Sequence, residues 1–380
     1  MPGKVREGGY IRAAGPTEFA RVCLRSHVRS GLYHGRIAGF GDTRVEFAAA
    51  YVAGRQHERS LVRSIHLAGA PLAAALLLAG CSGGIPAEPF VTSGATGGQD
   101  AESATPSPTP TPKELPMGGR TLFPTYRLVG YSGAIGTGPG LGRAGVGDID
   151  DRMKEIQERA KPLAADGRRI IPTIEFIATT VQPCNKAYPQ CRSVTSDERV
   201  QEHLDAVRKV DGMLLLAIQP GRSDFLTEVK RYEKFLKEPD VGIAMDPEWR
   251  MGPTQQPMAS FGSTDAKELN AVGAYLETLV AENDLPEKVM LYHMIRTNWV
   301  RNHEELKPRK GVAQILSVDG IGDQKLKEGT WGALMKVKPA HVHPGFKLFY
   351  KEDTAGPGWK LMTPAQVLAL KPTPEYVLYE

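Results

Sequence analysis

The sequence of 380 residues has few cysteines, no sustained run of like charge and no apolar stretch long enough to cross a bilayer comfortably. Its 47 basic and 43 acidic side chains are spread along the chain, so no basic stripe indicates a nucleic-acid partner, and we expect none. Hydrophobic residues make up 41% of the chain, which is enough for one large globular domain or two smaller ones.

An apolar stretch that is too short for a membrane span lies between Arg63 and Cys81, in the letters RSIHLAGAPLAAALLLAGC. A basic residue, a short apolar run and small residues before a cysteine are typical of a bacterial lipoprotein signal. The sequence therefore predicts a signal peptide over residues 62–80, cleaved before Cys81, which would then carry the lipid. The alternative is a buried helix that happens to end in cysteine.

The residues that follow Cys81 are rich in glycine, serine, threonine and proline and end in ATPSPTPTPKELP. Such a composition buries too little apolar surface to fold, so we expect an extended, disordered linker over residues 81–120. A lipid anchor, a spacer and a compact domain predict a protein held on the extracytoplasmic face of the cell membrane. The membrane, through the lipid on Cys81, is its expected partner.

Residues 1–61 fit this plan badly, because a signal peptide belongs at the N-terminus of a chain. They form a basic, glycine-rich extension with one cysteine, Cys23. We interpret them as an extension that results from a start site assigned too early. The alternative, a cytoplasmic regulatory tail, has no motif that supports it.

Two further cysteines, Cys184 and Cys191, lie in the short segment PCNKAYPQC. In an oxidising extracytoplasmic setting, a pair at this spacing predicts a disulfide bond. Metal binding is the alternative, but the segment has no second pair of ligands nearby.

Strand-length apolar runs alternate with amphipathic segments from Thr121 onward. The predicted strands cover residues 127–133, 169–180, 212–221, 241–249, 288–295, 312–322, 345–353 and 375–380. Eight strands with helices between several of them over residues 121–380 predict a TIM-like (β/α)₈ barrel that ends on its eighth strand. An open doubly wound sheet is the alternative, and the last third of the barrel shows the weakest helical pattern.

Three helices are predicted from faces that begin at Ile149, Phe225 and Leu269. A fourth is predicted to open at Thr195, which stands at capping-box spacing from Glu198.

Acids and other polar residues gather where the predicted strands end. In the fourth strand, VGIAMDPEW, alternation places Ala244, Asp246 and Glu248 on the side of the barrel axis. Polar or aromatic residues also end or nearly end the other strands: Tyr131, Glu175, Gln219, His293, Asp319 and Glu352. Because chemistry in these barrels occurs at the carboxyl ends of the strands, we expect a substrate site there.

Two carboxylates in different environments are the requirement for glycoside hydrolysis. We predict Glu248 as the general acid, Asp246 as the residue that supports it and Asp319 as the second carboxylate. Trp249 directly follows the acids, at a position where an aromatic ring can stack on a sugar.

The Asp-x-Glu-aromatic ending of Asp246, Glu248 and Trp249 resembles the fourth-strand signature of chitinase-type and barrel-type muramidase enzymes. The resemblance implies that the Glu is the acid and that the Asp supports it. The acidic repeat that precedes this signature in chitinases is absent here, with Gly242 and Ala244 in its place.

A broader resemblance covers residues 131–380, through YSGAIGTGPGLGRAG, LLLAIQPGRSD, AMDPEW, SVDGIG, FKLFYKEDT and LMTPAQVLALKPTPEYVLYE. These segments are similar to a family of uncharacterised bacterial secreted proteins and lipoproteins. The resemblance implies the limits of the domain and the polar strand ends, but it implies no reaction. It adds Lys351 to the expected residues of the site.

No cofactor and no metal ion are expected. The glycines of GLGRAG match a dinucleotide fingerprint, but the loop before them is too long for its tight first turn, so they predict a mobile loop over the barrel mouth. His341 and His343 stand at strand spacing without a third ligand, which favours surface histidines.

Three functions remain open. The first is an envelope-tethered enzyme that hydrolyses cell-wall or other polysaccharide by carboxylate acid/base catalysis. The second is a non-catalytic lipoprotein that binds a glycan or another wall component. The third is a structural lipoprotein that holds partners at the membrane. We expect a monomer in each case.

Overall fold

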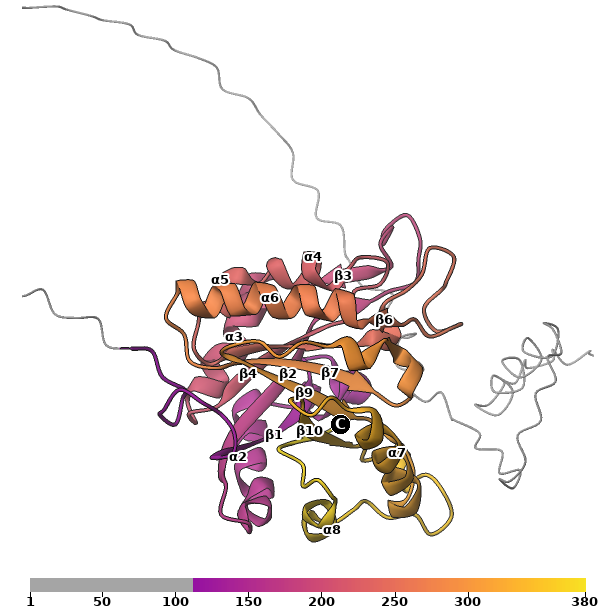
Figure 1. Ribbon diagram of the computed structural model, residues 1–380. Coiled ribbons are helices and arrows are strands. Elements are labelled where there is room, and N and C mark those ends of the chain that lie inside the picture. The colour runs from indigo at the N-terminus through magenta and orange to yellow at the C-terminus, as the bar shows by residue number, and fades with distance from the viewer. Residues whose placement is uncertain (1–111) are drawn as a thin grey trace, which may run out of the picture. The chain divides into compact units, whose positions relative to one another are not determined.

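The structure is a computed structural model that describes residues 112–380 (Figure 1). The predicted extension over residues 1–61, the signal peptide, the lipidated Cys81 and most of the linker lie outside the described residues.

Eight parallel strands form the centre of the domain. They are β1 (Tyr126–Gly133), β2 (Arg169–Val181), β4 (Met213–Ile218), β5 (Val241–Met245), β7 (Lys288–Met294), β9 (Val312–Val318), β10 (His343–Leu348) and β11 (Tyr376–Tyr379). Each of the eight predicted strands is found, including those of the last third of the chain. Their almost continuous apolar residues are typical of parallel strands that are buried on both faces.

The sheet closes on itself because β1 pairs in parallel with β2 on one side and with β11 on the other. In between, the order is β11, β10, β9, β7, β5, β4 and β2. The fold is therefore a closed (β/α)₈-type barrel, as predicted, and the open doubly wound sheet is excluded. A short strand, β3 (Arg192–Val194), pairs antiparallel with the end of β2 outside the barrel.

Helices surround the strands. They are α2 (Ile149–Ala160), α3 (Asp197–Arg208), α4 (Phe225–Lys230), α5 (Glu233–Leu236), α6 (Ala266–Glu282), α7 (Gln324–Val337) and α8 (Pro364–Ala369). In Figure 1, α4, α5 and α6 cover one side of the barrel, while α2, α7 and α8 lie on the other. The connection from β7 to β9 has only the 3₁₀ turns η6 (Thr297–Trp299) and η7 (His303–Glu305) around β8 (Val300–Arg301).

Two details of the helices differ from the prediction. The N-cap of α3 is Ser196 and not Thr195. The predicted helix from Phe225 to Leu236 is divided into α4 and α5, because Tyr232 leaves the helical conformation, with φ −101° and ψ 16°. Its hydroxyl group lies 2.9 Å from that of Thr179.

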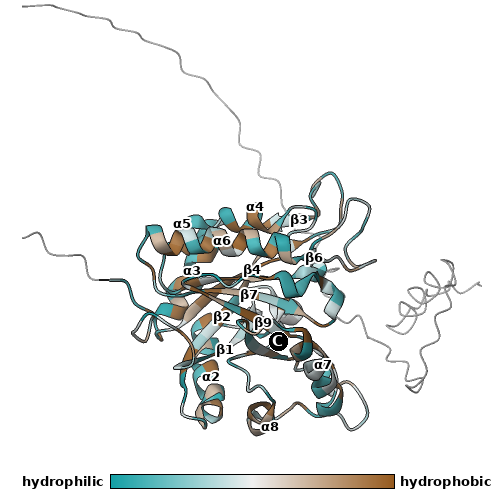
Figure 2. Ribbon diagram, viewed as in Figure 1, coloured by the Kyte–Doolittle hydropathy of each residue, from teal (hydrophilic) through white to brown (hydrophobic). Residues whose placement is uncertain are grey.

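Side chains alternate between two apolar layers along the strands. Val241, Ile243 and Met245 of β5 pack outward with the helices, while Ala244 belongs to the interior cluster with residues such as Leu215 and Leu291. Figure 2 shows hydrophobic colour along the strands and hydrophilic colour over most of the loops. The predicted inward and outward faces of β5 are therefore correct up to the end of the strand.

The amino-terminal end of the barrel is closed by Leu122 and by part of the segment that was predicted to be linker, which includes Leu115. Leu115 and Leu122 are buried in the interior cluster, and the Tyr126 hydroxyl donates to the backbone oxygens of Met117 and Gly118. Arg120 bonds Asp284 on the loop before β7. The packed domain therefore begins before residue 121. No helix within residues 112–380 is long and apolar enough to cross a membrane.

Candidate active site

Every strand of the barrel contributes a polar side chain to one layer near the carboxyl end of the barrel, where Glu175 lies level with Ser132 although β2 continues to Val181. In strand order these are Ser132, Glu175, Gln219, Asp246, His293, Asp319, Lys347 and Glu380. Four of them follow the last residue of a strand, yet their N–H groups still donate to the neighbouring strand: Gln219, Asp246, Asp319 and Glu380. This backbone pairing extends the strand alternation, so the side chains continue the inward-facing row.

His293 lies at the centre of this polar layer and is completely buried. Its Nδ1 lies 3.0 and 2.9 Å from the two carboxylate oxygens of Asp319. Its Nε2 lies 3.2 Å from Glu175 and 3.8 Å from Oδ1 of Asp246. Residues from four strands therefore meet around one imidazole ring.

The imidazole of His293 is held in its charged form. Burial alone would lower its pKa, but the carboxylates of Asp319 and Glu175 outweigh burial and raise the pKa well above the ordinary value. A charged imidazole donates from both ring nitrogens, one to each carboxylate.

Glu175 and Asp319 are ionised, and each accepts from more than one donor. Burial raises the pKa of each carboxyl group, but the charge of His293 and the hydrogen bonds to each group together lower it by more. Both pKa values therefore lie below the ordinary range. Glu175 also accepts from the Tyr376 hydroxyl at 2.6 Å, and Asp319 from the Ser317 hydroxyl at 2.9 Å. These acids therefore act as fixed counter-charges for His293.

Lys347 joins the same network from β10. Its Nζ lies 3.5 Å from Asp319 and 2.6 Å from Glu380, which also accepts from the Ser132 hydroxyl at 2.7 Å. These three residues and Tyr376 are missing from the sequence prediction. A lysine between Phe346 and Leu348 in a buried strand is the signal that could have identified Lys347.

Asp246 lies beside this network with a single side-chain donor. Nε2 of Gln219 donates to Asp246 at 3.0 Å, and the Gln219 carbonyl accepts from the backbone N–H of Val181. Burial and the charge of Glu175 outweigh the attraction of His293 and raise the pKa of Asp246 to about 6. Among the three acids around His293, Asp246 is therefore the one whose pKa is raised, while the pKa values of Glu175 and Asp319 are lowered.

Glu248 differs from the other acids because one of its carboxyl oxygens is enclosed without a hydrogen-bond donor among residues 112–380. β5 ends at Met245, and Glu248 lies in the 3₁₀ turn η5 (Pro247–Trp249) and not on a continuing strand as predicted. Its Oε2 atom is enclosed and has no hydrogen-bond partner among residues 112–380. Burial, followed by the charge of Asp246, raises its pKa well above the ordinary value, so Glu248 retains its proton at neutral pH.

Four predicted site residues lie outside this cluster. Tyr131 faces outward from β1, where its hydroxyl donates to Glu155 and accepts from Arg159, so Ser132 takes the inward position on that strand. Lys351 is exposed, and Glu352 opens the 3₁₀ turn η8 (Glu352–Thr354) after β10. Trp249 is only 6% exposed and packs with Val181 and Met251, although it directly follows Glu248.

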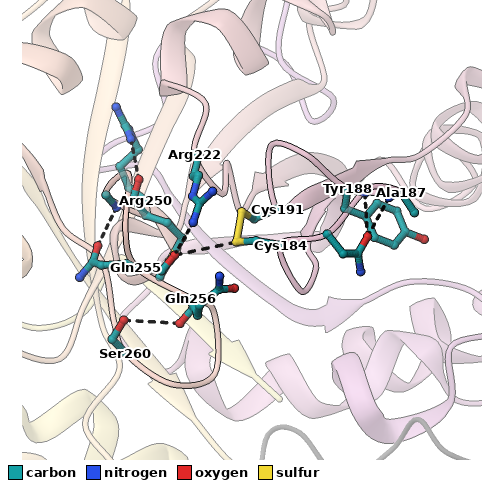
Figure 3. Close-up of a disulfide and its surroundings, with 12 residues drawn as sticks. Cys184, Ala187, Tyr188, Cys191, Arg222, Arg250, Gln255, Gln256 and Ser260 are labelled. Carbon is teal, nitrogen blue, oxygen red and sulfur yellow. Dashed lines mark hydrogen bonds between the residues drawn. A yellow bond between two sulfur atoms is a disulfide. The ribbon is translucent and has the colours of Figure 1, made fainter.

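The disulfide between Cys184 and Cys191 is present, as predicted, and lies in the loop after β2 (Figure 3). Sγ of Cys184 lies 3.8 Å from the backbone oxygen of Gln255, which also accepts from Arg222 at 3.1 Å. The loops after β2, β4 and β5 are therefore linked into one wall at the carboxyl end of the barrel.

The glycine-rich loop after β1 packs tightly against that strand. A Cβ atom on Gly142 would lie 2.4 Å from the backbone oxygen of Ser132, and Gly142 also adopts a φ of 105°. These glycines therefore permit close packing next to the site, a role that requires no dinucleotide.

The histidine pair lies elsewhere. His343 is at the start of β10, at the opposite end of the barrel, where it bonds Glu375 and packs on Phe123. Within the described part of the chain, no three His, Cys, Asp or Glu residues are grouped as metal ligands.

No protein-family model matches the chain, and no curated protein matches it.

Proposed function

We propose that the protein is a glycoside hydrolase that is anchored to the outer face of the membrane through a lipid on Cys81, and that its substrate is cell-wall or another polysaccharide. The observation that carries the proposal is Glu248, whose enclosed Oε2 has no hydrogen-bond partner among residues 112–380 and whose pKa is raised by burial and by the charge of Asp246, together with Asp246 itself, whose pKa is about 6. Glycoside hydrolysis needs one protonated and one ionised carboxyl group.

Glu248 is the general acid in this proposal. Its proton passes to the glycosidic oxygen as the bond from that oxygen to the anomeric carbon breaks. The raised pKa keeps the proton available at neutral pH, where an ordinary glutamic acid is ionised.

Asp246 replaces Asp319 as the proposed second carboxylate. Asp319 is occupied by His293, Ser317 and Lys347, whereas Asp246 has one side-chain donor and ionises within reach of neutral pH. Its carboxylate would stabilise the positive charge that develops at the anomeric carbon, or orient the attacking water. His293 and its two acids hold the geometry and the charge of the layer.

The test compares hydrolysis of cell-wall and glucan polysaccharides by the wild type, Glu248→Gln and Asp246→Asn. We expect each change to lower kcat by roughly 100- to 10,000-fold, the usual contribution of a positioned acid or base. Glu304→Gln, an exposed acid of η7, is the matched control and should retain full activity. If the wild type binds a glycan without cleaving it, the non-catalytic glycan-binding function replaces the enzyme.

The anchor is tested separately by mass spectrometry of the native N-terminus. A mature chain that begins at a lipidated Cys81 supports the proposed location, and mature peptides from residues 1–60 contradict it.

A further inference from the structure

One aromatic side chain of the mouth is left largely open to solvent. Phe261 is 55% exposed, more than any other large hydrophobic residue within residues 112–380. It belongs to the long loop between η5 and β6 (Thr264–Asp265), which also carries the exposed Met258. An exposed phenylalanine loses the free energy of burial, so a ligand that covers it gains that contribution.

Phe261 rests on two tryptophans from different loops. Its ring centroid lies 5.9 Å from that of Trp249 in η5 and 5.7 Å from that of Trp299 in η6. Trp331 donates its indole N–H to Lys371, whereas neither Trp249 nor Trp299 has an indole partner among the described residues. The three rings form an aromatic platform, in which the open ring of Phe261 packs on two tryptophans that are only 6% and 9% exposed.

The platform lies directly beside the proposed acid. The N–H of Gly262 donates to the backbone oxygen of Glu248 at 2.6 Å, and the N–H of Ser263 donates to that of Arg250 at 3.1 Å. A side chain on Gly262 would collide with the Arg250 backbone, which a Cβ atom would approach to 2.0 Å. The loop is therefore closed onto Glu248, with Phe261 next to the point of closure.

Side-chain contacts also fix the position of Phe261. Nε2 of Gln255 donates to the backbone oxygen of Phe261 at 2.8 Å, and the Gln255 backbone oxygen bonds Arg222 and contacts Cys184. The disulfide wall therefore supports the loop that presents the exposed ring.

We propose that the platform of Phe261, Trp249 and Trp299 is a sugar-binding subsite, on which one pyranose ring of a glycan stacks while a neighbouring linkage reaches Glu248. This inference rests on the proposed function and identifies its ligand class. The face of a pyranose carries C–H groups that pack on an aromatic ring, and its hydroxyls bond polar groups beside that ring. The adjacent carboxyl groups accept from sugar hydroxyls, which favours a glycan over a purely apolar partner.

The experiment measures binding of chitotetraose, cellotetraose, laminaritetraose and soluble peptidoglycan fragments to the full chain by calorimetry and by tryptophan fluorescence. At least one of these probes should bind and change the emission, because Phe261 contacts two tryptophans. Phe261→Ala should then weaken its Kd by about tenfold or more. Phe261→Trp should retain the affinity, and Met258→Ala, the matched exposed residue of the loop, should not change it.

Circular dichroism and melting of each variant show whether it is folded before Kd values are compared. Equal affinity of folded Phe261→Ala and the wild type for the bound probe overturns the subsite, as does failure of every probe to bind. Failure of the hydrolase proposal looks different, because the probe would then bind through Phe261 without being cleaved. Hydrolysis with no dependence of KM on Phe261 would instead retain the enzyme and reject the subsite.

Discussion

The acids at the mouth of the barrel differ in charge because burial and neighbouring charges act on them differently. Glu175 and Asp319 share a charged His293 and each receive a hydroxyl donor, so both are ionised. Glu248 has no donor for its enclosed Oε2 and keeps its proton. Burial and the nearest charges, together with the donors that each carboxyl group receives, therefore decide which acid can donate a proton.

The first prediction is that Glu248 makes the free energy of unfolding fall as the pH rises. Above about pH 4.3, Glu248 loses its proton in the unfolded chain. In the native state it keeps the proton until the pH reaches its raised pKa. The native state then binds more protons than the unfolded state, so stability falls as pH rises through this window. Glutamine does not titrate, so the Tm of Glu248→Gln should exceed that of the wild type by more at pH 8 than at pH 5. Each kcal/mol of difference in the free energy of unfolding corresponds to about 2–4 °C in Tm.

Calorimetric melting at the two pH values measures this gap, with Glu304→Gln as the exposed control. A gap that does not widen with pH, or a Tm for Glu248→Gln far below that of the wild type at pH 8, would show that Glu248 is ionised and paired in the fold.

Single residues also show how far the sequence alone could lead. The sequence identified five residues of the site because each ends or nearly ends an apolar run of strand length: Glu175, Gln219, Asp246, His293 and Asp319. Tyr131 was placed at the mouth because it lies near the end of a strand, but alternation turns it outward and Ser132 inward. Lys347 was missed because a lysine in a strand is ordinarily placed in solvent, and only the acids of neighbouring strands make its burial favourable.

The loops after the strands form the second level of organisation. The disulfide closes the loop after β2, and the Gln255 backbone oxygen joins Cys184 of that loop and Arg222 of the loop after β4 to the loop after β5 (Figure 3). The loop after β5 carries Glu248 and Phe261. The sequence predicted the disulfide from its spacing. It could not predict that Gln255, 71 residues after Cys184, lies against it, because that contact depends on barrel closure.

The element-scale prediction concerns this wall. Replacing Cys184 and Cys191 together by serine opens a loop whose ends are 7 residues apart, and loop-closure entropy gives a loss of roughly 2 kcal/mol in the free energy of unfolding. The contacts to Gln255 should weaken as well, so hydrogen exchange should increase in residues 252–262 while the barrel strands stay protected. Denaturant unfolding and exchange mass spectrometry measure the two effects.

Reduction of the wild type by a thiol is the matched control and should give the same exchange pattern. Increased exchange throughout the strands would instead mean that the disulfide supports the barrel core and not one wall of its mouth.

The fold could be predicted almost completely, because eight buried strands and their amphipathic helices leave strong periodic signals. The turn η5 was missed, since strand alternation was extended through Pro247 to Glu248. β5 is only five residues long and ends at Met245, and Pro247 opens the 3₁₀ turn that follows.

At the scale of the whole domain, the residues that stabilise the fold and those proposed for the chemistry lie at different levels along the barrel axis. Apolar side chains fill the interior and its amino-terminal end, where Leu115 and Leu122 close it. A polar layer to which all eight strands contribute closes the carboxyl end and includes Asp246, while Glu248 and the aromatic platform belong to the loops that follow the strands. This separation is typical of barrels that carry a site on the loops after their strands.

The most direct test of the account is the crystal structure of Glu248→Gln soaked with the glycan that the wild type cleaves or binds most tightly. The account predicts a sugar chain across the carboxyl end of the barrel, with one ring on Phe261. It also predicts a glycosidic oxygen within hydrogen-bond distance of the introduced amide, on the side of Asp246. A glycan bound elsewhere on the domain, or one that leaves residues 246 and 248 uncontacted, would contradict the account.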